Sequence, residues 1–182
     1  MEKRKRCERY QLKHPRISIE TRSTINMNEE RIGPALGKLP SGVYIATSTL
    51  DGEEVGMLAS FVEQAGFEPP TITAAISAGR RLNEAIQESG LIGINVLGEE
   101  DGRLMKPFNQ QENRSPFDSL ELEDNEYNIP QLTEALAFLA CKITGKIDSG
   151  DHTIYVAEVM DGILNDPERS PMVRIRRNGF QY

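Results

Sequence analysis

The chain has 182 residues, a formal net charge of −7 and an apolar fraction of 38%. A chain of this length and composition predicts one domain with a core of its own. No apolar run approaches the roughly 20 residues that a membrane-spanning helix needs. No apolar segment follows the basic N-terminus, so a secretory signal is not predicted either. Two cysteines and two histidines, far apart in the sequence, exclude a disulfide framework and a histidine-rich metal centre. We therefore expect a cytoplasmic protein that does not bind a membrane.

The charge is unevenly distributed along the chain. Residues 1–22 contain eight Lys or Arg and three Glu, whereas the rest of the chain is acidic. A basic arm on an acidic body could contact nucleic acid or the acidic face of a partner. The arm lacks interleaved aromatic residues, however, and the body would repel a phosphate backbone. We expect residues 1–27 to be a solvated basic extension, residues 28–182 to be the domain, and nucleic acid not to be a partner.

From Asn28 onward the pattern predicts a succession of short elements. Asn28 can cap a short helix that ends at Gly37. Runs of β-branched and aromatic residues predict strands, and Asp51-Gly52 predicts a tight hairpin turn between the first two. The predicted strands cover residues 43–50, 57–62, 71–77, 91–97, 137–147, 152–164 and 172–175. Further helices are predicted at residues 80–88 and near residues 104–108, and the remainder of 98–130 is expected to be a long loop with a short hairpin. About seven strands at hairpin spacing, with few helices, favour a mainly β antiparallel barrel over a parallel sheet.

The stretch Gly56–Pro70 is the first candidate for a binding site. It begins as a strand in which alternation places Phe61 on the face of Ala59, and Val62 on the face of Leu58. Small and polar residues follow, and the stretch ends at a double proline that a central strand does not hold. A strand with so little side-chain bulk allows a flat ligand to approach its backbone. The alternative is an ordinary barrel strand followed by a loop.

Two further motifs carry candidate binding groups. Residues Ser77 to Arg81 predict a strand end, a small turn and a helix start, where free N–H groups and two arginines suit a phosphate. The alternative is an exposed helix start. In Asp151-His152, at the start of a strand, the carboxylate can orient an imidazole that contacts a ligand or another subunit. The alternative there is an ordinary surface turn. Nucleophile elbows, phosphate loops, dinucleotide fingerprints and metal-ligand spacings are absent, so any chemistry would be that of a cofactor.

Taken in order, these motifs resemble one family. They are Gly42–Thr47, Gly56–Phe61 with Pro69-Pro70, Asn95–Leu97, Gly150–His152 and Pro171. Together they resemble the flavin reductase-like family, the FMN-binding split β-barrels, over roughly residues 29–182. Within that family the chain is similar to the flavin reductase module of flavodiiron proteins.

The resemblance implies a Greek-key split barrel with a few short helices, and a homodimer. It implies FMN rather than FAD at the subunit boundary, and hydride transfer from NAD(P)H to flavin N5. A nicotinamide nucleotide and a redox partner protein are therefore expected partners. The residues that the resemblance assigns to flavin binding are Met57, Leu58, Ala59, Ser60, Gln64, Ala65, Ser77, Arg80 and Arg81. His152 is the expected catalytic residue, beside the nicotinamide or the flavin face.

The chain also departs from the family pattern. Many reductases carry several hydroxyl residues where this chain has Leu58-Ala59-Ser60, and Gln64-Ala65-Gly66 replaces another hydroxyl-rich segment. These changes leave two other functions open. One is an FMN-binding electron-transfer or flavin-carrier protein without an NAD(P)H reaction of its own. The other is a binding module whose basic arm docks a partner.

Overall fold

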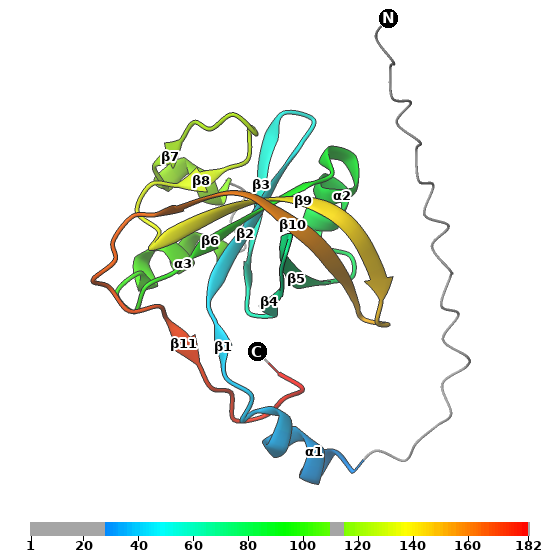
Figure 1. Ribbon diagram of the computed structural model, residues 1–182. Helices are drawn as coiled ribbons and strands as arrows, with labels where there is room; N and C mark the ends of the chain where they lie inside the picture. Colours follow the sequence, from blue (N-terminus) through cyan, green and yellow to red (C-terminus); the bar gives the residue numbers. More distant parts are fainter. Residues whose placement is uncertain (1–27, 110–114, 182) are drawn as a thin grey trace, which may run out of the picture.

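The computed structural model describes residues 28–109 and 115–181, so the predicted basic extension lies outside the described residues. Most of the regular structure is β (Figure 1). The strands are β1 Ser41–Gly42, β2 Tyr44–Leu50, β3 Glu53–Ala59, β4 Val62–Phe67, β5 Pro70–Ser77, β6 Leu91–Val96, β7 Leu122–Glu123, β8 Gln131–Leu132, β9 Ala137–Asp148, β10 His152–Leu164 and β11 Val173–Arg174. The helices are α1 Glu29–Leu36, α2 Arg81–Ser89 and α3 Gly102–Asn109, with a 3-10 turn at Pro116–Ser119.

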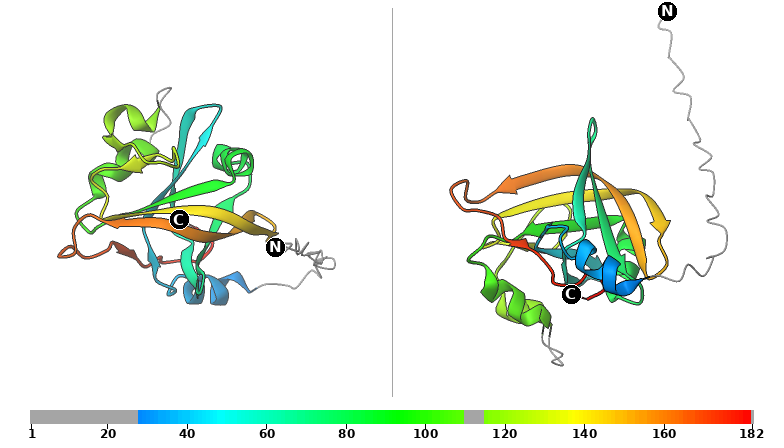
Figure 2. Two further views of the ribbon diagram at one scale, coloured as in Figure 1. Left: turned by 45° about the horizontal axis from the view of Figure 1, so that its top comes forward. Right: turned by 90° about the horizontal axis from the view of Figure 1, so that it is seen from below.

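Seven strands form one antiparallel sheet in the order β3-β2-β6-β9-β10-β5-β4. The two edge strands, β3 and β4, are consecutive in the chain and are joined by Ser60 and Phe61, yet they do not pair with each other. The sheet therefore curls until its edges meet at this link without closing (Figures 1 and 2). This is the split barrel that the sequence predicted.

The local signals that mark turns and helix ends are confirmed. The Asn28 side chain accepts a hydrogen bond from the Arg31 backbone N–H at 3.2 Å. Asp51 and Gly52 both have positive φ, 53° and 80°, as a tight hairpin between right-twisted strands requires. Gly90 ends α2 in the left-handed conformation, with φ 70°. These features set the length of the early elements.

The stretch after β3 differs from the prediction. Strand β3 ends at Ala59, and the two link residues break the alternation, so Val62 joins Ala59 in the barrel core instead of lying on the opposite face. The segment after it, which the alternative interpretation made a loop, is strand β4, and the β4–β5 hairpin projects from the barrel (Figure 2). The double proline closes that hairpin: Pro70 opens β5 and is the register partner of Phe67. A strand tolerates proline as its first residue because the missing N–H costs little there.

A buried asparagine ties the barrel to the loop before β8. The Asn95 side-chain amide donates to the backbone oxygens of Ile45 (3.1 Å) and Pro130 (3.4 Å). Its oxygen accepts from the Leu132 N–H at 2.7 Å. Asn95 is completely buried, so these bonds satisfy a group that would otherwise be costly to bury. Asn95 is thus a structural residue.

The C-terminal segment, residues 173–181, lies against α1 and β1 (Figure 1). Strand β11 pairs with β1, and the Gly179 N–H donates to the Gly33 carbonyl at 2.7 Å. A Cβ added to Gly179 would lie 2.1 Å from the Cβ of Leu36, so the two backbones approach as closely as glycine allows. The two ends of the described chain are therefore held together.

Within residues 28–109 and 115–181, no helix is both long and apolar enough to cross a bilayer.

Candidate functional site

A cavity of about 210 Å³ lies where β3 ends and the barrel opens. We call it the Ser60 cavity. Its lining comes from β3, the β3–β4 link, the end of β5, the start of α2, α3 and β11. The lining residues are Val43, Met57, Leu58, Ala59, Ser60, Ser77, Arg80, Met105, Phe108, Asn109 and Arg174. Six of the nine residues predicted to bind flavin are among them: Met57, Leu58, Ala59, Ser60, Ser77 and Arg80.

The Ser60 hydroxyl is a group of this cavity that can form a hydrogen bond to a ligand. Its Oγ is buried and has no hydrogen-bond partner among the described residues. Buried polar groups in folded proteins are nearly always paired, so such an atom in a cavity wall can form a hydrogen bond to a ligand. Strand β3 adds to this, because as an edge strand it has backbone groups on its outer side that no neighbouring strand pairs. The wall therefore offers hydrogen bonds to the edge of a polar ring.

Arg80 is the N-cap residue of α2, with extended backbone angles. Its Nε donates to the Ser77 hydroxyl at 3.3 Å, which draws the guanidinium toward the end of β5. The start of α2 is itself held by two successive hydrogen bonds that run from β10 to the end of β5. The buried Tyr155 hydroxyl donates to the Asn83 side-chain oxygen at 3.0 Å, and the Asn83 amide donates to the Ser77 carbonyl at 2.8 Å. Arg80 thus stands at a rigid helix N-terminus, where the free N–H groups also favour an anion.

The Ser60 cavity is positively charged. Arg80 and Arg174 line it, and none of its lining residues is acidic. The chain as a whole has a net charge of −7. Two cations gathered in one cavity of an acidic protein indicate an anionic ligand.

Three of the predicted binding residues do not line the cavity. Arg81 turns to the other side of the helix start and pairs with Glu53 at 2.5 Å, both side chains being largely exposed. Gln64 and Ala65 lie on β4 and are exposed, and the Gln64 amide donates to the Gly66 carbonyl at 3.3 Å. The cavity therefore gathers one of the two arginines of the predicted phosphate motif.

His152 lies beside the cavity and does not line it. It is the register partner of Ser77 across β10 and β5, and its side chain is 14% exposed. Its Nδ1 lies 3.1 Å from a carboxylate oxygen of Asp151, the residue predicted to orient it. Its ring is 5.8 Å from that of Phe61, in the β3–β4 link. His152 and Ser60 thus flank the same link residue.

Five lining residues were missed from the sequence, among them Asn109 at the end of α3. Met105 and Phe108 are one helical turn apart on α3, where the sequence predicted a short helix but assigned it no part in the site. Val43 and Arg174 reach the cavity through the pairing of β1 with β11, which no local pattern reveals. The lack of a side chain at Gly56 was predicted to let a flat ligand approach the strand, but it makes room for aromatic rings of the chain itself. A Cβ there would lie 2.7 Å from the Phe117 ring and 3.0 Å from the Phe108 ring, so the chain's own aromatic residues occupy this approach.

A second cavity, of about 220 Å³, adjoins Ser60 as well. We call it the Ser41 cavity; it is lined by five apolar residues together with Ser41, Ser60, Glu63, Thr73 and Arg176. Ser41 Oγ and Arg176 Nε are both buried without a hydrogen-bond partner among the described residues. The Arg176 guanidinium lies 4.9 Å from the centre of the Phe61 ring. Ser60 is the residue that the two linings share.

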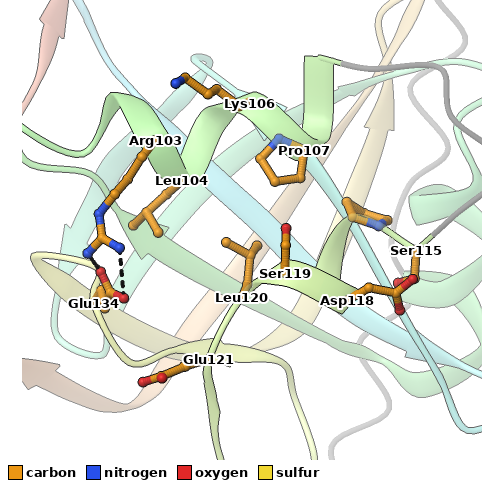
Figure 3. A pocket seen from close by; sticks show the side chains of 11 residues that line it. Arg103, Leu104, Lys106, Pro107, Ser115, Asp118, Ser119, Leu120, Glu121 and Glu134 are labelled. Atoms are coloured by element: carbon orange, nitrogen blue, oxygen red, sulfur yellow. Dashed lines mark hydrogen bonds and ion pairs between the residues drawn. The ribbon is translucent and has the colours of Figure 1, made fainter.

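A larger cavity, of about 560 Å³, lies apart from these residues, between α3 and the turn at Pro116–Ser119 (Figure 3). Its most prominent cation, Arg103, is paired with Glu134, and Lys106 points away from it (Figure 3). Its lining mixes both charges and includes none of the predicted site residues. Size alone therefore does not make it the candidate site. Among the described residues there is also no group of three or more His, Cys, Asp or Glu placed to hold a metal ion.

Comparison with known proteins places these features in a family. The family model of the flavin reductase like domain matches residues 36–181. Diflavin flavoprotein A 1 of Synechocystis sp. is 30% identical over 151 residues, which are 81% of this chain and 26% of that protein. The chain thus spans about a quarter of the length of this curated relative.

Two other similar proteins have lengths close to that of the chain. The ferric-chelate reductase (NAD(P)H) of Archaeoglobus fulgidus is 30% identical over 141 residues, covering 74% of this chain and 82% of that protein. The native-state structure of the flavin reductase PheA2 superimposes with a TM-score of 0.72 at 26% identity, covering 82% of this chain and 94% of that chain. This chain belongs to the family of flavin reductase-like domains.

Proposed function

We propose that the chain is an FMN-binding oxidoreductase of the NAD(P)H:flavin reductase type. The observation that carries the proposal is the Ser60 cavity, which combines an apolar wall, an unpaired buried hydroxyl and two arginines without an acid. A flavin mononucleotide has the matching parts: a flat apolar ring, a polar ring edge and an anionic phosphate. The family and the named activity of the Archaeoglobus relative support the same reaction class.

Each part of the cavity has a role in this proposal. The β3 residues Met57–Ala59 would line the flavin ring, and the Ser60 hydroxyl would bond to its polar edge. Ser77 and Arg80 would hold the phosphate at the start of α2. When bound, the flavin supplies the hydride acceptor, and the protein supplies alignment and exclusion of water.

His152 is the residue that we propose to contact the nicotinamide or the flavin face. Asp151 at Nδ1 would accept a hydrogen bond from that nitrogen and fix the ring orientation. The position of His152 opposite Ser77 puts it next to the proposed phosphate end and to Phe61. A residue that aligns the second substrate needs this kind of fixed, half-buried position.

We also propose that the active form is a homodimer located in the cytoplasm. Large apolar side chains are exposed at the end of α1, in the link after it and on the C-terminal segment, next to both cavities: Leu36, Leu39, Val173, Ile175 and Phe180. Exposed apolar clusters of this kind mark protein contacts. A second copy of the chain is the occupant that we propose.

Anaerobic spectroscopy of the purified protein tests the function. The protein, reconstituted with FMN, should be yellow, and NADH or NADPH should bleach the visible flavin band in the absence of air. A yellow protein that neither nucleotide bleaches would instead support the flavin-carrier alternative. A protein that takes up no flavin would contradict the proposal and favour the binding module.

A further inference from the structure

Arg174, on β11 near the C-terminus, contributes to the Ser60 cavity from a different element than Arg80, which stands at the start of α2. Resting on the function proposed above, we infer that Arg174 is a second phosphate-binding residue, so that the cavity selects a phosphorylated flavin through two cations on separate elements. The side chain of Arg174 is exposed, and no ion pair of it is found among the described residues. Its charge is therefore available to a ligand.

The backbone around Arg174 is held in place although its side chain is exposed. Arg174 is the register partner of Ser41 in the β1–β11 ladder. Just before it, the Met172 carbonyl accepts from the Val43 N–H at 3.2 Å, and the Met172 N–H donates to the Leu97 carbonyl at 2.8 Å. Just after it, the Arg176 N–H donates to the Gly37 carbonyl at 3.1 Å. Binding of a ligand therefore has to order only the side chain of Arg174 and not the backbone that carries it.

The charge of the lining matches one kind of ligand group. Arg80 and Arg174 repel each other unless an anion lies near both, and no acidic side chain of the lining supplies one. A phosphate monoester carries a charge of about −1.5 to −2 at neutral pH. A neutral flavin without phosphate would leave both cations unpaired. The two arginines thus discriminate between FMN and riboflavin.

Arginine neighbours of both residues provide matched controls. Arg81 follows Arg80 but is paired with Glu53 outside the cavity. Arg177 lies on the same C-terminal segment as Arg174, is exposed, and lines neither the Ser60 nor the Ser41 cavity. All four substitutions to Ala remove one positive charge, so the net charge of the protein changes by the same amount in each variant.

The test is titration of FMN and of riboflavin into Arg174→Ala, Arg80→Ala, Arg81→Ala and Arg177→Ala, followed by flavin fluorescence. Arg174→Ala should weaken FMN about 10- to 100-fold, as expected for loss of a charge-assisted contact, and leave riboflavin unchanged. Arg174→Lys should recover part of the loss, and Arg81→Ala and Arg177→Ala should match the wild type. The salt dependence of FMN affinity should fall in Arg174→Ala but not in Arg177→Ala.

Several results would overturn the inference. The inference is wrong if Arg174→Ala keeps the wild-type preference for FMN over riboflavin. It is also wrong if Arg174→Ala loses affinity for both ligands equally. If Arg80→Ala loses the preference while Arg174→Ala retains it, the inference fails and the proposed function stands. If the wild-type protein binds neither flavin, the proposed function fails as well.

Discussion

Arg80 and Arg81 show how strongly the role of a side chain depends on one step along the backbone. Arg80 is in extended conformation at the N-cap and lines the Ser60 cavity, whereas Arg81 is the first helical residue. Successive residues of a helix point in directions about 100° apart, so the second arginine faces away from the cavity. There it meets Glu53, and an exposed pair of this kind contributes little to stability. Two adjacent arginines therefore do not make a two-arginine site.

Cys141 allows a prediction about pH. The thiol is fully buried in the barrel core, and burial raises its pKa from 9.0 to about 12. Between these values the unfolded chain loses the proton and the folded chain keeps it. The free energy of unfolding should therefore be unaffected below about pH 9 and should fall as pH rises toward 12, by up to about 1.4 kcal/mol per pH unit. Urea unfolding at pH 8, 9.5 and 10.5 measures this.

Cys141→Ala is the control for that measurement. Burial also raises the pKa of Tyr155 above 10.0, so this phenol too makes the free energy of unfolding fall as pH rises. The variant should therefore lose only part of the pH dependence seen in the wild type. Parallel curves for wild type and variant would show that the buried thiol is not responsible.

At the scale of elements, α3 and the turn after it close one side of the barrel opening. Phe108 of α3 and Phe117 of the turn meet edge to face, with ring centres 5.4 Å apart. Both rings lie over the bare backbone of Gly56 in β3. The position of Phe108 in the cavity wall therefore depends on the absence of a side chain in the opposite strand.

Gly56→Ala tests this dependence. The new methyl group would overlap the Phe117 and Phe108 rings, so the free energy of unfolding should drop by about 1–3 kcal/mol, the usual cost of overpacking. Riboflavin and FMN should both bind less tightly, because the displaced wall faces the ring and not the phosphate. Gly102→Ala on α3 is the matched control, since a Cβ there meets nothing within 4 Å. Unchanged flavin binding in Gly56→Ala would show that Phe108 does not contribute to the flavin site.

At the scale of the whole molecule, the apolar face formed by α1 and the C-terminal segment has no cover within the described chain. Ile175 is 63% exposed there and Leu39 is 60% exposed. Such a face is costly to leave in water, and a second copy of the chain would remove it from solvent.

Light scattering tests the dimer. The wild-type protein should have twice the chain mass of 20.4 kDa. Ile175→Glu should shift it toward the monomer, because a carboxylate is costly to bury in an apolar interface. Leu122→Glu, at an exposed apolar residue on β7 at the far end of the barrel, should leave the mass unchanged (Figure 1). A wild-type monomer at all concentrations would contradict the proposal.

Sequence patterns predicted most of the barrel, because its strands are rich in β-formers and its turns use asparagine, aspartate and glycine. They failed at β4, where Gln64, Ala65 and Gly66 have little strand preference of their own. Pairing with β5 makes that segment a strand, and such pairing is a property of the folded chain. β3 and the start of α2 carry local sequence motifs and could be expected at the site, whereas Arg174 could not. Its contribution depends on two chain ends meeting, which leaves no local mark.

Ser60 is common to the walls of two cavities, the Ser60 cavity and the Ser41 cavity. Its hydroxyl has a single proton to donate, and an acceptor in either cavity could take that hydrogen bond. A molecule that takes this proton in one cavity withdraws it from whatever sits in the other. Occupants of the two cavities would therefore weaken each other through this serine, and the antagonism would be equal in both directions.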